Sequence, residues 1–292
     1  MIASNGDDRL SEQALNVVHL KKAFGKTEVL HDVNLAVLKG EVYGLVGQNG
    51  AGKTTLLRLI AGLMKPTGGS ISIYTEKDFI GYMPQNCRFD GGTSVADTIR
   101  FFASIRKADY QKSFSLCKKL ELDTAKKVKH LSPGQQKKLQ LVIAMIGEPD
   151  LYILDEPTAG LDPNATYEMM NMIGSLHKDG KSILISSHIL QDMDEICTKI
   201  AILDKGRLIY SKELESSYVI KTEPVPRHTY EVLAKKYLLA SNETRTVLYV
   251  KTDKKGVSEL VKALVGDSIG IFEVSSCNVK AIVQEQLHIG GG

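Results

Sequence analysis

Short apolar runs alternate along the chain with longer segments in which apolar residues recur every three or four positions. The runs at 151–154 and 183–186 lack polar alternation, as expected for strands covered on both faces of a parallel sheet. Further strands are predicted at 15–20, 41–46 and 200–203, the last followed by a turn at 204–207 and a strand at 208–210. Helical spacing is found at 54–63 and 163–177. The pattern predicts an α/β domain.

Residues 93–122 lack strand signals and place Val95, Ile99, Phe102 and Ile105 at helical spacing. We therefore expect a helical insertion, at about 93–140, that separates the two halves of the sheet domain. The stripe is interpreted first as a surface packed in the core. A groove nearby for a partner protein is the alternative that the pattern leaves open.

The pattern changes after residue 210, where the main domain is expected to end. Prolines and charges at 221–226 indicate a linker or an irregular edge. Strands at 247–250 and 269–274 and helices at 257–264 and 279–287 then predict a small α+β unit. The expected divisions are a flexible N-terminus at 1–14, a main domain at 15–211, an accessory domain at 212–286 and a flexible tail at 287–292.

The composition is that of an ordinary water-soluble protein, with 43% hydrophobic and 24% charged residues and a net charge of +3. This charge is too small to indicate a nucleic-acid partner. No apolar run reaches the roughly 18 to 20 residues of a membrane span, and residues 1–10 lack a signal-peptide core, so a cytosolic location is expected. The four cysteines, Cys87, Cys117, Cys197 and Cys277, are scattered, which favours reduced thiols over disulfides or a metal site.

A glycine-rich segment joins the strand at 41–46 to the helix at 54–63, the context of a phosphate-binding loop. Its backbone N–H groups and the following helix N-terminus would hold nucleotide phosphates. Lys53 would neutralise β- and γ-phosphate charge, and the Thr54 hydroxyl would ligate Mg²⁺. The expected nucleotide-binding residues are Gly47, Gln48, Asn49, Gly50, Ala51, Gly52, Lys53, Thr54 and Thr55.

Two adjacent carboxylates, Asp155 and Glu156, end the buried strand at 151–154. Successive strand side chains point to opposite faces, so the two groups can serve different purposes. We assign Asp155 to the Mg²⁺ shell and Glu156 to the polarisation of the attacking water. The segment 131–135, Leu-Ser-Pro-Gly-Gln, stands apart from the phosphate loop and suggests a donor surface for a nucleotide held by another copy. Ser132 followed by Pro133 is also an ordinary helix start.

Together these motifs make residues 15–211 resemble the nucleotide-binding subunit of an ATP-binding cassette (ABC) transporter. The family signature LSGGQ is matched at 131–135, with Pro133 in place of the first glycine. The resemblance implies that Ser132 and Gly134 contact the γ-phosphate in a second copy. It also implies that Gln85 reaches Mg²⁺ and water, and that His188 bonds the γ-phosphate.

The resemblance further implies that Phe24 stacks on adenine and that Asp162 lies in the loop crossing the dimer interface, although Asp162 before Pro163 is also a good helix N-cap. The catalytic set is then Glu156, His188 and Gln85, the metal set is Thr54, Gln85 and Asp155, and the cofactors are ATP and Mg²⁺. The implied fold is α/β, a P-loop NTPase of ABC type with a mixed sheet, a helical insertion and a small C-terminal α+β domain.

The implied function is that of an ATP-hydrolysing motor. Two copies, or one copy and a related ATPase subunit, would close head to tail on Mg-ATP. They would drive translocation through a separate transmembrane permease docked near Gln85 and the insertion. The motor would be cytoplasmic and peripheral on the membrane. The C-terminal unit is similar to extensions in bacterial exporters of peptide antibiotics, lantibiotics and drugs, which favours export.

Two alternatives remain open. A soluble ABC ATPase could act on nucleic acid or the ribosome without a membrane partner, but the long coiled coils, zinc cysteines or second cassette typical of that class are not found in this sequence. A regulatory module could close on ATP without hydrolysis, which Glu156 and His188 argue against. No direct contact with nucleic acid is expected.

Overall fold

The computed structural model describes residues 12–77, 79–188, 193–194, 196–213, 217–252 and 254–276. The chain divides into two compact units, unit 1 at Met1–Lys212 and unit 2 at Glu213–Gly292. The expected flexible tail at 287–292, the expected helix at 279–287, Cys277 and most of the expected flexible N-terminus lie outside the described residues.

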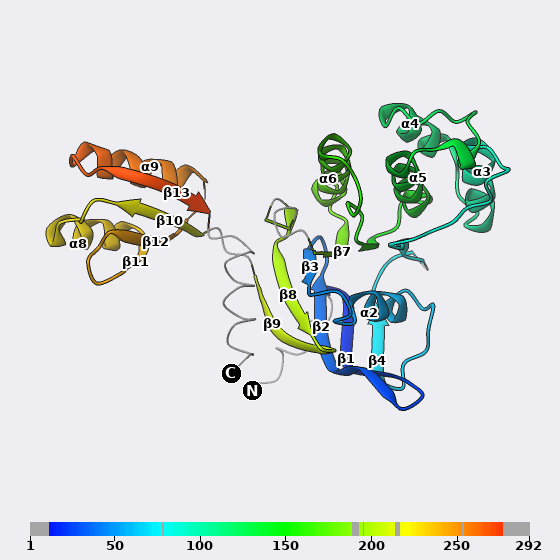
Figure 1. The fold of residues 1–292 in the computed structure, drawn as a ribbon, viewed down its shortest axis with the longest axis horizontal. Helices are drawn as coiled ribbons and strands as arrows, with labels where there is room; N and C mark the ends of the chain where they lie inside the picture. Colours follow the sequence, from blue (N-terminus) through cyan, green and yellow to red (C-terminus); the bar gives the residue numbers. More distant parts are fainter. Residues whose placement is uncertain are drawn as a thin grey trace, which may run out of the picture. The chain divides into compact units, whose positions relative to one another are not determined.

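Unit 1 is built on a six-stranded sheet in the order β5-β6-β7-β3-β8-β9 (Figure 1). From β5 to β8 each neighbouring pair is parallel. All residues of β3, β6 and β7 are buried, which explains why their sequences lack polar alternation. The strands are β3 (Val42–Val46), β5 (Gly81–Met83), β6 (Leu151–Asp155), β7 (Ser182–Ser187), β8 (Lys199–Asp204) and β9 (Arg207–Glu213).

A second, antiparallel sheet in the order β2-β1-β4 makes unit 1 a mixed structure. Its strands are β1 (Gln13–Phe24), β2 (Thr27–Leu38) and β4 (Gly68–Ile73), of which only part of β1 was predicted. Helix α2 (Lys53–Ile60) packs its buried leucines with both sheets in one apolar core. The pairing of β1 with β2 is long and contains several register shifts. Each shift interrupts the two-residue alternation of buried and exposed side chains from which a strand is predicted, which explains why these strands were missed.

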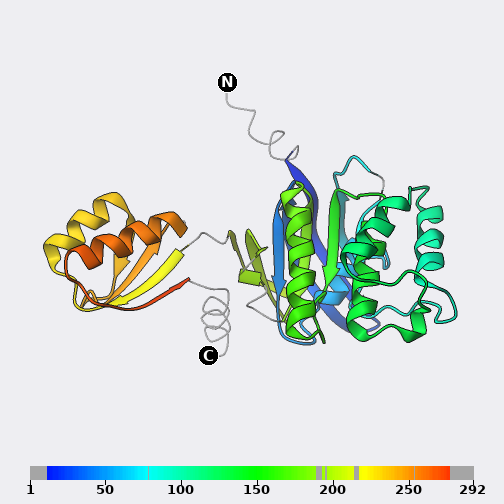
Figure 2. The same cartoon turned by 90° about the horizontal axis from the view of Figure 1, so that it is seen from above.

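The helical insertion consists of α3 (Val95–Ile105), α4 (Gln111–Lys119), a 3₁₀ turn (Val128–His130) and α5 (Pro133–Met145), which lie together at one side of unit 1 (Figures 1 and 2). Helix α6 (Pro163–Lys178) follows β6. Val95 and Ile99 are fully buried in the insertion's own core, as predicted, and Phe102 packs against it. The prediction was wrong for Ile105, which is 62% exposed because α3 ends there and its packed stripe ends with it.

Unit 2 has the element order β-α-β-β-α-β, the ferredoxin-like arrangement. Its antiparallel sheet has the order β11-β12-β10-β13, and both helices contribute side chains to one apolar core against it. The elements are β10 (Ser217–Thr222), α8 (Arg227–Lys236), β11 (Leu238–Ser241), β12 (Val247–Lys251), α9 (Lys254–Gly266) and β13 (Ile271–Ser276).

Of the two interpretations of residues 221–226, a linker or an irregular edge, the linker is wrong, because the segment lies inside unit 2. Lys221 and Thr222 end β10, and Val225 is fully buried. The Val225 N–H donates to the carbonyl of Arg245, whose side chain donates back to the Val225 carbonyl at 2.8 Å. The prolines therefore shape a turn inside unit 2. Cys87, Cys117 and Cys197 are free thiols, as predicted, and none of the described helices combines the length and apolarity of a membrane span.

The insertion's core provides a stability test. Ile99→Ala should lower the free energy of unfolding by about 2–5 kcal/mol, because the removed side chain leaves a cavity in a packed core. Ile105→Ala on the same helix should change it by less than about 0.5 kcal/mol, because the side chain is exposed. Urea denaturation of both variants checks this. Equal losses would show that α3 packs differently.

Candidate functional site

The phosphate-binding loop turns sharply between β3 and α2 and requires glycine at two positions. A Cβ at Gly47 would lie 2.4 Å from the Leu203 carbonyl oxygen. Gly52 has φ of +107°, and a Cβ there would lie 2.9 Å from Leu30 Cδ2. No larger residue fits either place. These glycines thus let the loop pack closely against β8 while its following helix starts at Lys53.

Lys53 is only 5% exposed and folds back over the loop. Its Nζ donates to the carbonyls of Gly47 at 2.7 Å and Gln48 at 3.3 Å, and lies 3.7 Å from Glu156 Oε1. A buried ammonium needs such partners because burial disfavours an isolated charge. The lysine charge is therefore fixed between the phosphate loop and the carboxylate that ends β6.

Three residues predicted to be catalytic meet at one carboxylate. Glu156 is 6% exposed, and its Oε2 accepts a 2.8 Å hydrogen bond from Gln85 Nε2. His188 Nδ1 lies 3.3 Å from the same oxygen. The sequence separates these residues widely, but they follow β5, β6 and β7, which are neighbours in the sheet. Parallel strands bring their carboxyl ends to one edge, and there the side chains converge.

The phosphate loop and these three residues line one cavity of about 550 Å³, a size suited to a small molecule. Gly47 and Ala51 are not among its lining residues and instead support the loop from behind; the Ala51 carbonyl accepts a hydrogen bond from Gly206 N–H. The lining comprises Val29, Gln48, Asn49, Gly50, Gly52, Lys53, Thr54, Thr55, Gln85, Glu156, Ala159 and His188.

Asp155, next to Glu156 in the chain, is fully buried and is not among the residues that line this cavity. Its Oδ1 accepts a 2.7 Å hydrogen bond from Ser186 Oγ, while its Oδ2 is buried without a hydrogen-bond partner among the described residues. A buried carboxylate oxygen without a partner is costly, so a cation is a fitting one. No group of three or more His, Cys, Asp or Glu in the described chain could hold a metal alone. Mg²⁺ is usually held by one or two carboxylates together with substrate phosphates, so a single carboxylate such as that of Asp155 fits this ion.

The signature residues lie outside this cavity. Ser132 is the exposed N-cap of α5, and its Oγ accepts from the Gln135 N–H at 3.2 Å. The Gln135 side chain accepts in return from the Ser132 N–H, which completes a capping box. Pro133 occupies the first helical position, and Gly134 is half-buried. Neither Ser132 nor Gly134 lines the cavity, so the signature segment stands apart from it.

Two other predicted residues also lie outside the cavity lining. Phe24 is 50% exposed, with Lys22 Nζ 5.0 Å from its ring centroid. Asp162 caps α6 by accepting from the Ala165 N–H at 3.0 Å, the structural role expected of an Asp before proline.

Sequence reasoning missed two residues that hold the site in shape. Ser186 bonds both Asp155 and the Glu156 N–H, the latter at 3.0 Å. A polar residue ending an apolar strand was its only signal. Lys137 donates to the carbonyls of Gln85 and Glu156. It lies inside α5, where nothing in the sequence distinguishes it from neighbouring lysines.

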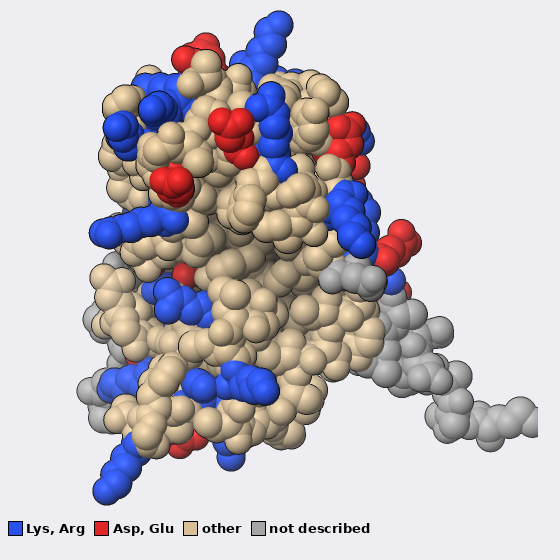
Figure 3. Space-filling view, turned by 90° about the vertical axis from the view of Figure 1, so that its right-hand side faces the viewer, with Lys and Arg blue, Asp and Glu red and all other residues tan. Residues whose placement is uncertain are grey.

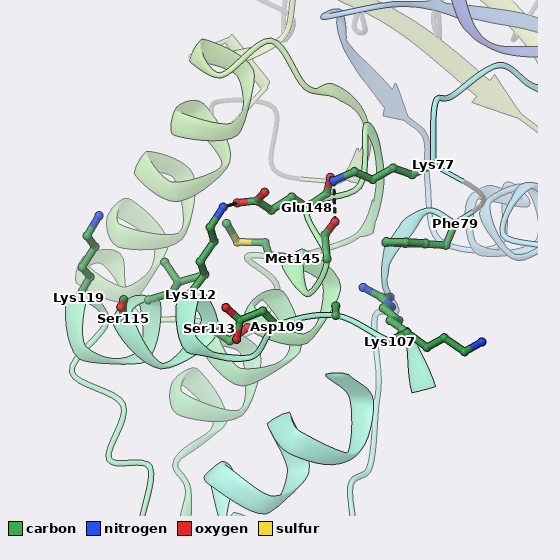
Figure 4. A pocket seen from close by; sticks show the side chains of 14 residues that line it. Lys77, Phe79, Lys107, Asp109, Lys112, Ser113, Ser115, Lys119, Met145 and Glu148 are labelled. Carbon is green, nitrogen blue, oxygen red and sulfur yellow. Dashed lines mark hydrogen bonds and ion pairs between the residues drawn. The ribbon is translucent and has the colours of Figure 1, made fainter. Parts of the chain in front are cut away.

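A second cleft, of about 700 Å³, opens between the insertion and the segment before β5 (Figure 4). Phe79, Leu116 and Met145 supply apolar surface, and lysines stand around it. Lys112 pairs with Glu148 at 2.6 Å, and Lys77 donates to the carbonyls of Gly147 and Glu148. On the side that carries the insertion, Figure 3 shows a hollow with a mainly uncharged floor and with both Lys or Arg and Asp or Glu side chains around it. The full lining is Lys77, Phe79, Arg106, Lys107, Ala108, Asp109, Lys112, Ser113, Ser115, Leu116, Lys119, Met145, Gly147 and Glu148.

Comparison with known proteins agrees with this geometry. Residues 30–159 match the family model described as ABC transporter. The chain is 35% identical to the uncharacterized ABC transporter ATP-binding protein MJ1023 of Methanocaldococcus jannaschii, over 69% of this chain and 78% of that protein. It is 34% identical to the lantibiotic transport ATP-binding protein SrtF of Streptococcus pyogenes, over 70% of this chain and 92% of that protein.

Among solved structures, the ATP-binding subunit of an ABC transporter superposes with a TM-score of 0.63 at 31% identity, covering 69% of this chain and 90% of that one. The expected fold class, an α/β P-loop NTPase of ABC type, is confirmed. The chain belongs to the ABC transporter family, as one of its ATP-binding cassette ATPases.

Proposed function

We propose that two copies of this chain, or one copy and a related ATPase subunit, hydrolyse Mg-ATP at a head-to-tail interface and drive export through a separate membrane permease. The observation that carries the proposal is the convergence of Gln85, Glu156 and His188 on the phosphate loop in one cavity. It unites a phosphate-binding surface with a carboxylate placed to act on water.

The nucleotide phosphates would lie over the loop, where backbone N–H groups and the α2 N-terminus favour anions. Lys53 would turn from the loop carbonyls to the β- and γ-phosphates. Thr54 and Asp155 would hold Mg²⁺, with Gln85 alongside, and the unpartnered Asp155 Oδ2 supports this assignment. The ion supplies charge neutralisation on the phosphate oxygens. Phe24, exposed on β1, would stack on the adenine ring.

Hydrolysis would depend on Glu156. In this structure its Oε2 already accepts a hydrogen bond from Gln85, so the carboxylate is oriented before substrate arrives. The carboxylate would accept a proton from the attacking water as the bond from the water oxygen to the γ-phosphorus forms and the bond from that phosphorus to the β–γ bridging oxygen breaks, so that ADP leaves. His188, whose side chain is 48% exposed, would turn from Glu156 towards a γ-phosphate oxygen. Lys53 and His188 thus each have a partner within the chain that the nucleotide phosphates would replace.

The head-to-tail arrangement rests on the position of the signature. Ser132 and Gly134 stand at the accessible start of α5 and do not line their own copy's cavity. A helix N-terminus attracts anions, so this surface suits a γ-phosphate presented by another copy, with Asp162 near the junction. ATP would favour the closed dimer through contacts that ADP lacks, and hydrolysis would release it.

The second cleft supports a membrane partner. It combines apolar side chains with a basic surround, which suits a short amphipathic segment of a permease that carries an acidic group. It is lined by the insertion, as expected, although Gln85 is not part of its lining. Through this contact the chain would be a peripheral protein on the cytoplasmic face of the membrane. The transport role named for the lantibiotic relative favours export.

Substitution of Glu156 tests the chemistry. Glu156→Gln should lower ATP turnover by about 100- to 10,000-fold, because the amide cannot accept the proton. Equilibrium ATP binding should persist, since Lys53 and the loop are unchanged. Phosphate release and nucleotide binding are the measurements. Glu231→Gln, on the exposed surface of unit 2, is the matched control and should leave turnover unchanged. Full turnover in Glu156→Gln would remove Glu156 from the reaction.

Mixing two inactive variants tests the head-to-tail arrangement. Lys53→Met disables the phosphate loop, while Gly134→Asp places a negative charge against phosphate without a clash, because a Cβ there meets only ordinary contacts at 3.7 Å. Mixed dimers would contain one intact site, so an equal mixture should recover about a quarter of wild-type turnover by random pairing. If the mixture recovers no ATP turnover in the steady-state assay, the phosphate loop and the signature act in the site of the same copy, and the head-to-tail arrangement is wrong.

Charge reversal in the cleft tests the permease contact. Lys107→Glu with Lys119→Glu should reduce co-purification of a multi-span membrane protein from native membranes, because acidic partner groups would be repelled. Basal turnover of the isolated chain should stay unchanged. Lys39→Glu, an exposed residue outside the cleft, is the control. Capture of ribosomal or nucleic-acid partners by the wild-type chain would favour the soluble ABC ATPase instead.

A further inference from the structure

Lys137 is a lysine of α5 that is only 9% exposed. Its Nζ donates to two main-chain carbonyls, that of Gln85 at 2.7 Å and that of Glu156 at 3.1 Å. Each acceptor belongs to a loop that follows a strand of the central sheet, β5 or β6. One side chain on the insertion thus connects two loops of the other part of unit 1.

The same two loops are also joined through their side chains. Gln85 Nε2 donates to Glu156 Oε2 at 2.8 Å. The two loops are therefore joined twice. Lys137 bridges their main-chain carbonyls, and the bond between the Gln85 amide and the Glu156 carboxylate joins their side chains at the cavity. Displacement of Lys137 would therefore change the separation of the Gln85 and Glu156 backbones, and with it the side-chain bond that orients the carboxylate.

The Glu156 backbone needs such support because it has φ of 49°, a left-handed conformation that is unfavourable for a residue other than glycine. Strained residues persist where the surroundings determine them from several sides. Ser186 accepts the Glu156 N–H through both its carbonyl and its hydroxyl oxygens. The Glu156 carbonyl accepts from Lys137 and from the Ala159 N–H at 3.2 Å. Lys137 is the only one of these partners that comes from the insertion.

Burial of a lysine disfavours its charged form, and it lowers the pKa of Lys137, while the negative charges of Asp155 and Glu156 act to raise that pKa. An apolar side chain would fill an interior helix position with less desolvation. The presence of a lysine at this buried position is therefore explained by the hydrogen bonds that it donates.

Helix α5 connects this lysine with the signature. Ser132 caps the helix, and Lys137 lies little more than one turn further along. A helix moves largely as a rigid body over such a distance, so movement of its N-terminus also moves the Lys137 backbone. If the signature is engaged by the nucleotide of a second copy, as in the proposed function on which this inference rests, that engagement reaches the Gln85 and Glu156 loops directly.

We propose that Lys137 is a positioning residue, which holds the Gln85 and Glu156 loops in the hydrolytic geometry and couples that geometry to the placement of the signature helix. Lys137 is not among the residues that line the cavity proposed to hold nucleotide. It acts through the orientation of Glu156, so its loss should reduce the rate of the chemical step and spare ATP binding.

The test compares Lys137→Met with Lys137→Arg, which keeps a donor for the carbonyls, and with Lys138→Met on the same helix. Lys138 bonds the Leu120 carbonyl and Glu168, away from the cavity lining. In the full chain, Lys137→Met should lower kcat by about 10- to 100-fold, the scale of a small misplacement of a catalytic group. ATP affinity, measured by equilibrium binding, should stay within about threefold. Lys137→Arg should recover most of kcat, and Lys138→Met should match wild type.

A double variant separates this role from a general loss of structure. If Lys137 acts through Glu156, adding Lys137→Met to Glu156→Gln should not lower the residual turnover further. A wild-type kcat in Lys137→Met would overturn the inference, as would an equal loss in Lys138→Met. A parallel fall in ATP affinity and Tm would also overturn it, by showing only damage to the fold. Turnover that survives Glu156→Gln would refute the proposed role of Glu156 and the route through it. Turnover lost in Glu156→Gln and kept in Lys137→Met would refute the inference alone.

Discussion

The parallel order of β5, β6, β7 and β3 is the constraint on which the rest of the site depends. The strands are buried and hydrogen-bonded side by side, so their carboxyl ends share one edge. Each strand end leads to a different functional group: the phosphate loop after β3, Gln85 after β5, the acidic pair at the end of β6 and His188 after β7. The sheet therefore fixes distances between groups that are far apart in sequence, and substrate need not organise them.

The buried carboxylates at this edge have partners within the chain. Asp155 is held by Ser186, and Glu156 lies among Gln85, His188 and the Lys53 ammonium. These hydrogen bonds and ion pairs offset the cost of burying the two carboxylates. Oδ2 of Asp155 is an exception among the described atoms, and it lies on the residue expected to meet a cation. The proposed nucleotide and cation would therefore replace contacts that these groups make with one another.

Much of unit 1 could be predicted because buried parallel strands and phosphate loops leave local signals. Gly47 and Lys53 follow directly from the strand, loop and helix context. Other features depend on contacts that no local pattern encodes. The end of α3 left Ile105 exposed although its spacing matches the buried stripe. Val225 looked like part of a linker, yet its exchange of bonds with Arg245 places it in unit 2. Lys137 became distinct only when the fold brought two distant carbonyls to its side chain.

The proline in the signature departs from the family motif without disturbing the local helix start. Pro133 stands at the first helical position, where the missing N–H would have had no partner within the helix. The capping box between Ser132 and Gln135 is complete despite it. The helix therefore loses nothing by the exchange, and the only donor removed is one that a phosphate could have used. The proline ring fixes φ of Pro133, which limits the backbone conformations at the start of the helix before any partner binds. The helix start is thus more rigid than one with glycine, at the cost of one potential ligand contact.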